Sequence, residues 1–481
     1  MTDPSELQTK LLIDGTWREG SDNATFPVFD PSSGATLAEV SAGSVDDVVA
    51  ACDSAQRAQR VWAAVAPRDK AEILRRCWQG LLDHQDSLAR LITSEHGKAL
   101  GDSAGEVAYA AEFFRWNAEE AVRLRGELAL APAGGRRMLV QHHPIGVVVI
   151  VTPWNFPAAM ITRKLAPALA AGNAAVIKPP AETPLTALRV AEILLEAGVP
   201  DGLVNVVPTQ DPGAWFDAAV DHPATRMVSF TGSTATGRLL LRRCADRILK
   251  TVMELGGNAP FVVFADADLD TAVEGAMVAK MRHSAETCTA ANRFYVESSV
   301  VDAFTERLVE AMSKVVVGPG AVDGVTCGPL IHDGAVAKVD GLVRQAVEVG
   351  ASVVLGGRPV EGPGSFYEPT VLRDVPPDAA ITREEIFGPV APIIAFDDVE
   401  EMLGWANDTE MGLTGYVYTA DLKRGLAVSE RIEAGMIGLN QGAISDPAAP
   451  FGGMKQSGLG REGSTDGILE FCETQYIAVD W

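Results

Sequence analysis

Residues 147–178 read VVVIVTPWNFPAAMITRKLAPALAAGNAAVIK, and the order of patterns within them decides the fold. An apolar run from Val147 to Val151 leads into a polar loop. An apolar, helix-like stretch from Met160 to Ala171 follows and is closed by Gly172, and a second apolar run spans Ala174 to Ile177. Two apolar runs joined through a helix are typical of neighbouring parallel strands. The stretch therefore predicts a β-α-β unit.

The same alternation continues towards the C-terminus. Helix-like stretches at 183–197 and 236–247 alternate with apolar runs at 203–207 and 227–230. A second alternating series begins near Pro260, with expected strands at 261–264, 294–296, 352–355, 392–396, 415–418 and 436–439 and expected helices at 269–281, 301–315, 336–349 and 399–407. The sequence therefore predicts an α/β fold with two doubly wound parallel-sheet domains. In such sheets ligands bind beyond the carboxyl ends of the strands.

Outside these two alternating series, the sequence predicts a few smaller elements. Residues 11–40 have the pattern of short strands and turns, and residues 44–125 have helical periodicity. The tail at 474–479 is expected to be a strand that pairs with Met138 to Gln141 in a small protruding ribbon. Because such a ribbon would leave an exposed sheet edge in a monomer, we expect a homodimer or homotetramer.

Composition excludes several classes of function. The 481 residues include 40 basic and 64 acidic ones, and a net charge of −24 disfavours nucleic acid and anionic membranes as partners. No apolar run reaches the ~20 residues that a bilayer span needs, and the N-terminus does not resemble a secretion signal. Six scattered cysteines and seven histidines show no disulfide framework or metal-site spacing. We expect a cytoplasmic protein without a bound metal.

A candidate nucleophile lies between two elements of the second series, where residues 281–294 read MRHSAETCTAANRF. Cys288 follows an expected helix and has Arg282 and Arg293 nearby. A thiolate is the reactive form of cysteine, and neighbouring cations lower its pKa, so an accessible, electropositive setting is expected here. Most single cysteines are instead small buried apolar side chains. The motifs elsewhere in the chain decide between these two interpretations.

Six motifs follow one another along the chain: Thr152-Pro-Trp-Asn-Phe-Pro157, Phe230-Thr-Gly-Ser233, Met253-Glu-Leu-Gly-Gly257, Cys288 with Ala291-Asn-Arg293, Glu385-Ile-Phe-Gly-Pro389 and Pro450-Phe-Gly-Gly453. In this order they resemble the signatures of the aldehyde dehydrogenase superfamily, and they cover essentially the whole chain. The resemblance implies oxidation of an aldehyde to an acid with NAD or NADP. It also implies a Rossmann-like NAD(P)-binding domain at 1–124 and 145–253, a catalytic domain at 254–449, an oligomerisation ribbon at 125–144 and 470–481, and a linking segment at 450–469.

The resemblance implies three catalytic residues. Cys288 matches the nucleophile that turns the aldehyde into a thiohemiacetal and then a thioester. Asn155 matches the side-chain donor to the oxyanion, together with the backbone N–H of Cys288. Glu254 matches the base that activates water for thioester hydrolysis, and burial would raise its pKa towards a useful value. Without the resemblance, Asn155 would be an ordinary turn residue and Glu254 an ion-paired residue at a strand end.

The resemblance also implies a cofactor site. Lys178 matches a contact to the adenosine ribose, and Gly232 and Ser233 open a helix whose backbone donors can receive a pyrophosphate. Where NAD-preferring relatives carry a glutamate, this chain has Ala181, so NADP is favoured, with NAD also used. The full expected set is Thr152, Pro153, Trp154, Lys178, Ala181, Gly232, Ser233, Leu255, Glu385 and Phe387.

A finer resemblance concerns the substrate. Arg163, Arg282 and Ser445 match the residues with which succinate-semialdehyde dehydrogenases bind the distal carboxylate of their substrate. Guanidinium groups suit this task because charge-assisted hydrogen bonds to carboxylates are strong. Each arginine alone could equally be an ordinary helix charge. A glutarate-semialdehyde or other aldehyde dehydrogenase remains the alternative, since one methylene changes binding by only ~1–3 kcal/mol.

Two further points stay open. Most relatives carry Gly-Gln just before the nucleophile, whereas this chain has Ala285-Glu286. A carboxylate aimed at Cys288 would raise the thiol pKa, so we expect Glu286 to point away or to pair with a cation. From a different functional class, a crystallin-like structural protein could keep this fold without catalysis. The intact set of Cys288, Glu254 and Asn155 argues against that alternative.

Overall fold

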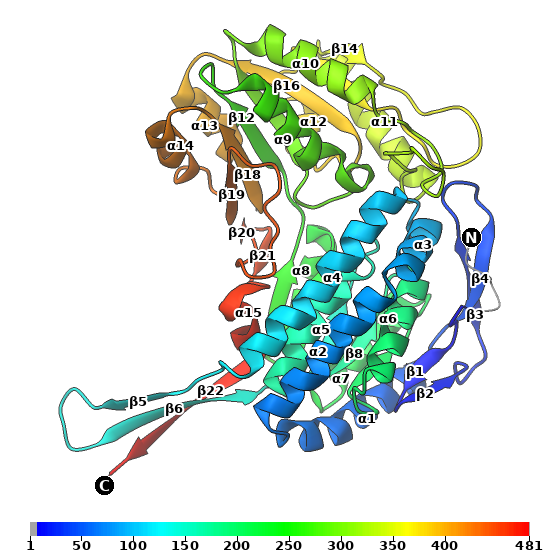
Figure 1. The fold of residues 1–481 in the computed structure, drawn as a ribbon, viewed down its shortest axis with the longest axis vertical. Helices are drawn as coiled ribbons and strands as arrows, with labels where there is room; N and C mark the ends of the chain where they lie inside the picture. Colours follow the sequence, from blue (N-terminus) through cyan, green and yellow to red (C-terminus); the bar gives the residue numbers. More distant parts are fainter. Residues whose placement is uncertain (1–6, 481) are drawn as a thin grey trace.

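The computed structural model describes residues 7–480, and two large sheets organise them (Figure 1). The first sheet has eight strands in the order β2-β1-β9-β8-β7-β10-β11-β21, and its five central strands run parallel. The strands are β1 (Leu11–Ile13), β2 (Thr16–Arg18), β7 (Val147–Val151), β8 (Ala174–Lys178), β9 (Val204–Val206), β10 (Thr225–Thr231), β11 (Lys250–Glu254) and β21 (Gly458–Leu459). Strands β7 and β8 are buried at every residue, as expected for the centre of a two-faced parallel sheet.

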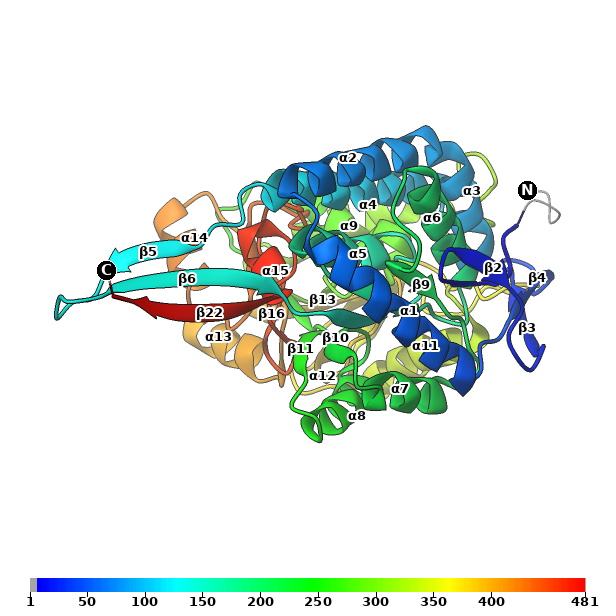
Figure 2. The same cartoon turned by 90° about the horizontal axis from the view of Figure 1, so that it is seen from below.

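Helices cover this first sheet on both faces (Figures 1 and 2). Helix α5 is buried along its whole length because β7 and β8 lie on one side of it and α2 and α4 on the other. Gly172 ends α5 in the left-handed conformation, with φ of +97°, which lets the chain turn back into β8. The helices are α1 (Val45–Ala63), α2 (Pro67–Asp83), α3 (Gln85–His96), α4 (Leu100–Ala121), α5 (Ala159–Ala171), α6 (Pro184–Glu196), α7 (Pro212–Asp221) and α8 (Thr234–Ala245).

The second sheet has seven strands in the order β14-β15-β16-β13-β12-β18-β19, and only the β14–β15 pair is antiparallel. Its strands are β12 (Ala259–Val263), β13 (Ala291–Glu297), β14 (Ser352–Leu355), β15 (Thr370–Arg373), β16 (Val390–Phe396), β18 (Thr414–Tyr418) and β19 (Met436–Leu439). Around it lie α9 (Leu269–Met281), the short 3-10 helix η2 (Arg282–Ala285), α10 (Val301–Ser313), α11 (Asp333–Glu348), α12 (Ala380–Arg383), α13 (Val399–Asn407) and α14 (Leu422–Ser429).

A narrow antiparallel ribbon projects from the rest of the molecule (Figures 1 and 2). Strand β22 (Cys472–Val479) pairs with β6 (Arg137–Pro144), placing Thr474 opposite His142. This confirms the strand pair that the sequence predicts, and β5 (Glu127–Leu130) adds a third strand on the other side of β6. Leu128, Leu130 and Tyr476 leave more than half of their surface exposed on this ribbon.

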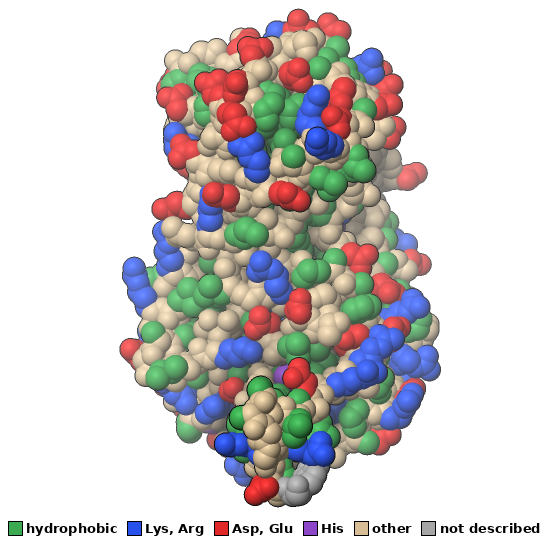
Figure 3. All heavy atoms as spheres, turned by 90° about the vertical axis from the view of Figure 1, so that its left-hand side faces the viewer, with side chains coloured by type: hydrophobic (Ala, Val, Ile, Leu, Met, Phe, Trp, Pro, Cys, Tyr) green, Lys and Arg blue, Asp and Glu red, His purple; other side chains and the backbone are tan. Residues whose placement is uncertain are grey.

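The remaining elements are short: the β3–β4 hairpin (Thr25–Phe29 and Thr36–Ser41), the β17–β20 pair (Met411–Gly412 and Met454–Lys455) and α15 (Ser464–Glu470). On the face towards which the ribbon projects, acidic and basic side chains are both spread widely (Figure 3). No helix within residues 7–480 is long and apolar enough to cross a membrane.

The predicted α/β fold with two parallel-sheet units and a ribbon is confirmed. The strands at the edges correct one detail, because β1, β2, β14 and β21 run antiparallel to their neighbours. Helix α7 and strand β11 were not predicted. The short pattern Lys250-Thr-Val-Met-Glu254 carries too few apolar residues to signal a strand by itself.

Candidate active site

Four central strands of the first sheet end at the same place and deliver most of the predicted site residues. Asn155 follows β7, Lys178 ends β8, Gly232 follows β10, and Glu254 ends β11. Parallel strands bring their carboxyl ends to one edge of a sheet, which is where ligands bind in this architecture. The second sheet closes the site from the other side with Cys288, which lies between η2 and β13.

The loop before Cys288 has an unusual backbone. His283, Ser284 and Ala285 adopt positive φ angles of 55°, 56° and 65° in succession. Each such residue costs about 1–2 kcal/mol when it is not glycine, so surrounding contacts must hold the loop in place. One of them joins the backbone N–H of His283 to a carboxylate oxygen of Asp102, 2.9 Å away.

A glycine allows Cys288 to lie against the first sheet. A Cβ atom built on Gly257 would lie only 2.4 Å from the carbonyl oxygen of Cys288. No side chain fits at that distance, so any other residue at 257 would push the nucleophile loop away from Glu254 and its neighbours. The second glycine of the Met253–Gly257 motif is therefore needed for this close approach.

A cavity of about 220 Å³ opens at Cys288. Arg163, Arg282 and Ser445, which the sequence predicts as one group, all line it together with Cys288. They come from α5, the end of α9 and the loop after β19, so the fold brings together residues far apart in the chain. The other lining residues are Gly101, Asp102, Gly105, Glu106, Tyr109, Phe156, Met160, His283, Thr287, Thr289 and Phe451.

Arg163 is held firmly at the wall of this cavity. It is only 2 % exposed, which excludes the alternative that it is a surface charge. Its Nε lies 2.5 Å from a carboxylate oxygen of Glu462, and its guanidinium carbon lies 4.0 Å from the ring centre of Phe451. Its buried Nη2 has no hydrogen-bond partner among residues 7–480. A buried, unpaired guanidinium donor beside a cavity is suited to an anionic ligand group.

Arg282 supplies a second cation to the same cavity. The side chain is only partly buried, and its Nε is buried without a hydrogen-bond partner in the described part of the chain. Lys164, next to Arg163, forms an ion pair with Glu462 as well. Although burial opposes it, the Lys164 and Arg163 cations lower the pKa of Glu462, which keeps this carboxyl ionised. Glu462 thus offsets one of the positive charges, and Arg282 remains available to a ligand.

Glu254 is a buried carboxyl group at the end of β11. Neither of its carboxylate oxygens has a hydrogen-bond partner among the residues that the structure describes, so the alternative of an ion-paired strand end is wrong. Burial, and next the negative charge of Glu462, raise the pKa of Glu254 well above its usual range. A raised pKa makes the ionised form of this carboxyl a stronger proton acceptor, which the activation of water requires.

Asn155 is fixed at both ends. Its Nδ2 donates to the backbone carbonyl of Glu286 at 2.9 Å, so it reaches across to the nucleophile loop. Its own backbone carbonyl accepts a hydrogen bond from the Lys98 Nζ at 2.5 Å. The residue is 5 % exposed and lines a second cavity, which Cys288 also lines.

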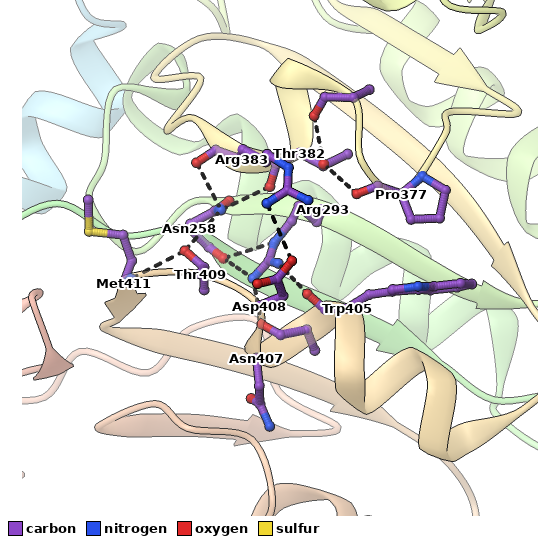
Figure 4. Close-up of polar contacts among 12 residues, drawn as sticks. Asn258, Arg293, Pro377, Thr382, Arg383, Trp405, Asn407, Asp408, Thr409 and Met411 are labelled. Atoms are coloured by element: carbon purple, nitrogen blue, oxygen red, sulfur yellow. Dashed lines mark hydrogen bonds and ion pairs between the residues drawn. The ribbon is translucent and has the colours of Figure 1, made fainter.

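The electropositive setting expected for Cys288 is wrong. Burial, and next the carboxylate of Glu385, raise the pKa of the Cys288 thiol to about 12. Arg293 does not offset this, because it turns into the second sheet and donates to the backbone carbonyls of Asn258, Trp405 and Ala406 (Figure 4). The free protein therefore holds Cys288 as a thiol, although the residue remains partly accessible.

Two further cavities, of about 330 and 550 Å³, adjoin along the carboxyl ends of the first sheet. They share Pro153, Trp154, Thr231, Gly232 and Ser233, and the smaller one reaches Cys288. Together they form a groove that ends at the nucleophile. All ten residues predicted for the cofactor line this groove: Thr152, Pro153, Trp154, Lys178, Ala181, Gly232, Ser233, Leu255, Glu385 and Phe387.

Several polar groups of the groove already form hydrogen bonds within the protein. Lys178 is buried, and its Nζ donates to the carbonyl of Pro179 at 3.0 Å. Ser233 caps α8 by accepting from the N–H of Thr236 at 3.2 Å. The N–H of Gly232 donates to the carbonyl of Glu254 and is therefore already engaged. The expected pyrophosphate donors are therefore the N–H groups at the start of α8.

Glu385 faces Cys288 across the smaller cavity of the groove. One of its oxygens accepts from the N–H of Gly257 at 3.1 Å, and burial raises its pKa to about 7. Lys338 donates to its backbone carbonyl at 2.6 Å. Trp154 and Phe387 meet edge to face with ring centres 5.5 Å apart, forming an aromatic wall.

Several residues of the site are not among those that the sequence predicts. Tyr109 and Phe451 line the cavity with the arginines, Glu462 pairs with Arg163, and His332 and Lys338 line the groove. Glu462 had a recognisable signal, because it is a charged residue among the glycines of the 458–463 segment. Tyr109 had none, since it lies within an ordinary helical pattern.

Glu286 points away from the nucleophile, as expected. One of its oxygens accepts from the backbone N–H of Ile331 at 3.0 Å, and the other lies 3.8 Å from the Nε2 of His96. Burial raises the pKa of Glu286 well above its usual range and lowers that of His96 well below its own. Both shifts favour the uncharged forms of the two groups, and the carboxyl group of Glu286 is directed away from Cys288.

Comparisons with known proteins agree with this arrangement. A model of the aldehyde dehydrogenase family matches residues 17–477. The chain is 47 % identical to succinate-semialdehyde dehydrogenase [NADP(+)] GabD of Escherichia coli, covering 100 % of this chain and 99 % of that one. It is 45 % identical to glutarate-semialdehyde dehydrogenase of Pseudomonas aeruginosa over the same shares. The crystal structure of succinate-semialdehyde dehydrogenase from Burkholderia pseudomallei superposes with a TM-score of 0.98 at 46 % identity, covering 100 % of both chains. The chain belongs to the aldehyde dehydrogenase family.

Proposed function

We propose that this enzyme oxidises succinate semialdehyde to succinate, with NADP or NAD as the hydride acceptor and NADP favoured. The observation that carries the proposal is one cavity in which Arg163, Arg282 and Ser445 surround an approach to Cys288. The relatives named for succinate semialdehyde and for glutarate semialdehyde both support an aldehyde with a distal carboxylate. Six free cysteines fit a reducing compartment, for which we propose the cytoplasm.

Cys288 would begin the reaction. After the thiol loses its proton to solvent, the sulfur attacks the aldehyde carbon, a C–S bond forms, and the carbonyl π electrons move to oxygen. Asn155 Nδ2 and the backbone N–H of Cys288 would donate to this oxygen. One such donor is worth about 2.7–4 kcal/mol in acyl-transfer enzymes. Asn155 must then exchange its present bond to the Glu286 carbonyl for one to the substrate.

The bound nicotinamide cofactor supplies the acceptor for the hydride that leaves this adduct. The residues of the groove suit such a cofactor. Lys178 and the start of α8 offer donors for the ribose and phosphates, and Trp154, Phe387 and Glu385 surround the end near Cys288. Ala181 leaves room, and no charge of its own, beside the ribose. Glu182 lines the same part of the groove and is the reason for keeping NAD as an acceptor.

Glu254 would complete the reaction. Its carboxylate takes a proton from water while the water oxygen attacks the thioester carbon, the C–S bond breaks, and the acid leaves with the thiolate restored on Cys288. The carboxyl is buried and lacks partners among the described residues, so a water molecule can be its hydrogen-bond partner. Its raised pKa makes its ionised form a better acceptor for this proton.

Arg163, Arg282 and Ser445 are proposed to select the substrate by binding its carboxylate. The test therefore compares kcat/KM for an aldehyde that has a carboxylate and one that lacks it. We expect Arg282→Ala to lower kcat/KM for succinate semialdehyde by ~10–100-fold, because a hydrogen bond to a charged group contributes ~1.5–3 kcal/mol. The value for butanal, which has four carbons and no carboxylate, should change less than about threefold. Equal losses for both aldehydes would show that Arg282 has only a structural role.

Two alternatives have distinct outcomes. If glutarate semialdehyde gives the higher kcat/KM, the chemistry stands and the cavity favours five carbons. If the purified protein turns over no aldehyde with either cofactor and Cys288 resists iodoacetamide, a crystallin-like structural role replaces the enzyme.

A further inference from the structure

Helix α4 contacts both loops that form the proposed oxyanion site. Asp102 and Glu106 lie one helical turn apart on it. Asp102 accepts from the N–H of His283 on the nucleophile loop at 2.9 Å. Glu106 Oε1 accepts from the N–H groups of Ala158 and Ala159, at 2.9 and 3.2 Å, just after the loop that carries Asn155. One rigid element therefore ties the two loops together.

Lys98 completes this connection. Its side chain is fully buried, and its Nζ donates to Glu106 Oε2 at 2.7 Å and to the carbonyl oxygen of Asn155 at 2.5 Å. The ammonium also lies 4.6 Å from the ring centre of Phe156. Among residues 7–480, the hydrogen-bond partners and the ring contact of this ammonium are thus Glu106 and parts of the loop that carries Asn155.

Stability alone is a weak reason to bury this ion pair. Removing two charges from water costs several kcal/mol for each ion, and apolar replacements for buried pairs are often neutral or stabilising. What the pair supplies is a fixed geometry. It holds the main chain of Asn155 from one side while Nδ2 reaches the Glu286 carbonyl on the other. Catalytic donors lose much of their effect when they are displaced by even 1 Å.

We propose that Lys98 and Glu106 are positioning residues that set Asn155 for oxyanion stabilisation, and that they act on the reaction only through Asn155. This inference rests on the proposed function, in which Asn155 donates to the oxyanion. Neither residue is a candidate for binding the cofactor, and neither lies in any of the six motifs. Glu106 also lines the cavity at Cys288, whereas Lys98 does not, so Lys98→Met is the variant that tests positioning alone.

The test is a double-mutant cycle on the full-length enzyme. Lys98→Met and Glu106→Gln are each made alone and together with Asn155→Ala, and kcat, KM and the rate of Cys288 alkylation by iodoacetamide are measured. We expect Lys98→Met to lower kcat ~10–100-fold, less than the ~100–1,000-fold of a lost donor. In the Asn155→Ala background it should change kcat less than about twofold, since residues acting as one unit are not additive.

Alkylation of Cys288 by iodoacetamide forms no oxyanion, so it distinguishes a misplaced Asn155 from a general disruption of the active site. The alkylation rate of Lys98→Met should stay within about twofold of the wild-type rate. Asp47→Asn is the matched control, as Asp47 is a buried carboxylate that completes the capping box of α1 and pairs with Arg18. Its kcat should not change. If Lys98→Met fails to fold, Glu106→Gln, which keeps an acceptor for Ala158 and Ala159, carries the same test.

The outcomes distinguish the inference from the proposed function. If Lys98→Met lowers kcat equally in the wild-type and Asn155→Ala backgrounds, the inference is overturned. A fall in the rate of Cys288 alkylation that matches the fall in kcat would also overturn it. A normal kcat in Asn155→Ala itself would instead overturn the role of Asn155. A large loss in Asn155→Ala with none in Lys98→Met or Glu106→Gln would leave the proposed function standing and reject the positioning residues.

Discussion

At Cys288 the resting group is a thiol, and this has a consequence that kinetics can measure. With a pKa of about 12, the thiolate fraction rises about tenfold for each pH unit through the neutral and mildly alkaline range. We predict that alkylation of the free enzyme by iodoacetamide accelerates steadily from pH 7 to pH 9. A Cys288→Ser variant gives the background from the other five cysteines, which are buried. A plateau below pH 8 would show that a cation or base lowers this pKa.

For Glu286 we predict that substitution has little effect on kcat. Its side chain is directed to Ile331 and His96, and burial raises its pKa and so favours its uncharged form. Glu286→Gln keeps the acceptor for the Ile331 N–H and should therefore leave kcat within about twofold. Steady-state kinetics at pH 7.5 check this. A large gain in rate would mean that a carboxylate charge does reach the nucleophile.

The identities of the site residues could be read from the sequence, but their charge states could not. Motifs fix which residues occupy the site because they record residue types at known spacings. The pKa of Cys288 depends on Glu385, 97 positions away, and on burial by both sheets. The direction of Arg293, five residues beyond Cys288, depends on carbonyls near the end of α13. Such long-range contacts leave no local pattern.

At the scale of elements, Arg293 joins the start of β13 to the end of α13 (Figure 4). It is fully buried and supplies hydrogen bonds to the carbonyls of Asn258, Trp405 and Ala406. We predict that Arg293→Met lowers the free energy of unfolding by about 3 kcal/mol or more, because two buried carbonyls and a partly buried one would lose their donor. Thermal melting should show a clear drop in Tm.

The matched control for this prediction is Arg431→Met. Arg431 is ion-paired with Glu400 at the surface, where such pairs contribute little, and the Tm should barely move. Equal melting temperatures for the two variants would contradict the account of Arg293.

Element order was predictable where local patterns are strong. Parallel strands buried on both faces, such as β7 and β8, give unbroken apolar runs, and Gly172 ends α5 where the sequence places it. The antiparallel edge strands were not predictable. Strand β21 has two residues and pairs with β11 only because the chain returns from the second sheet.

At the scale of the whole molecule, the ribbon of β5, β6 and β22 projects without a covering layer (Figures 1 and 2). We predict that it joins subunits of a homodimer or homotetramer, since apolar side chains such as Leu128 and Leu130 are exposed there. Deleting residues 474–481 would remove most of β22 and leave β6 with an unpaired edge. Light scattering should then show a smaller species than the full chain. An unchanged mass would assign assembly to another surface.

The proposed function requires that Arg163, Arg282 and Ser445 hold the distal carboxylate of the same molecule whose aldehyde Cys288 attacks. The most direct test measures kcat/KM of the wild-type enzyme for succinate semialdehyde and for butanal, with saturating NADP and then NAD. We predict a preference of at least ~100-fold for succinate semialdehyde, from two or more charge-assisted hydrogen bonds. The kcat/KM for succinate semialdehyde with NADP, divided by the value with NAD, measures how strongly Ala181 favours NADP. Comparable values for both aldehydes would contradict the account, because the arginines would then not bind the substrate.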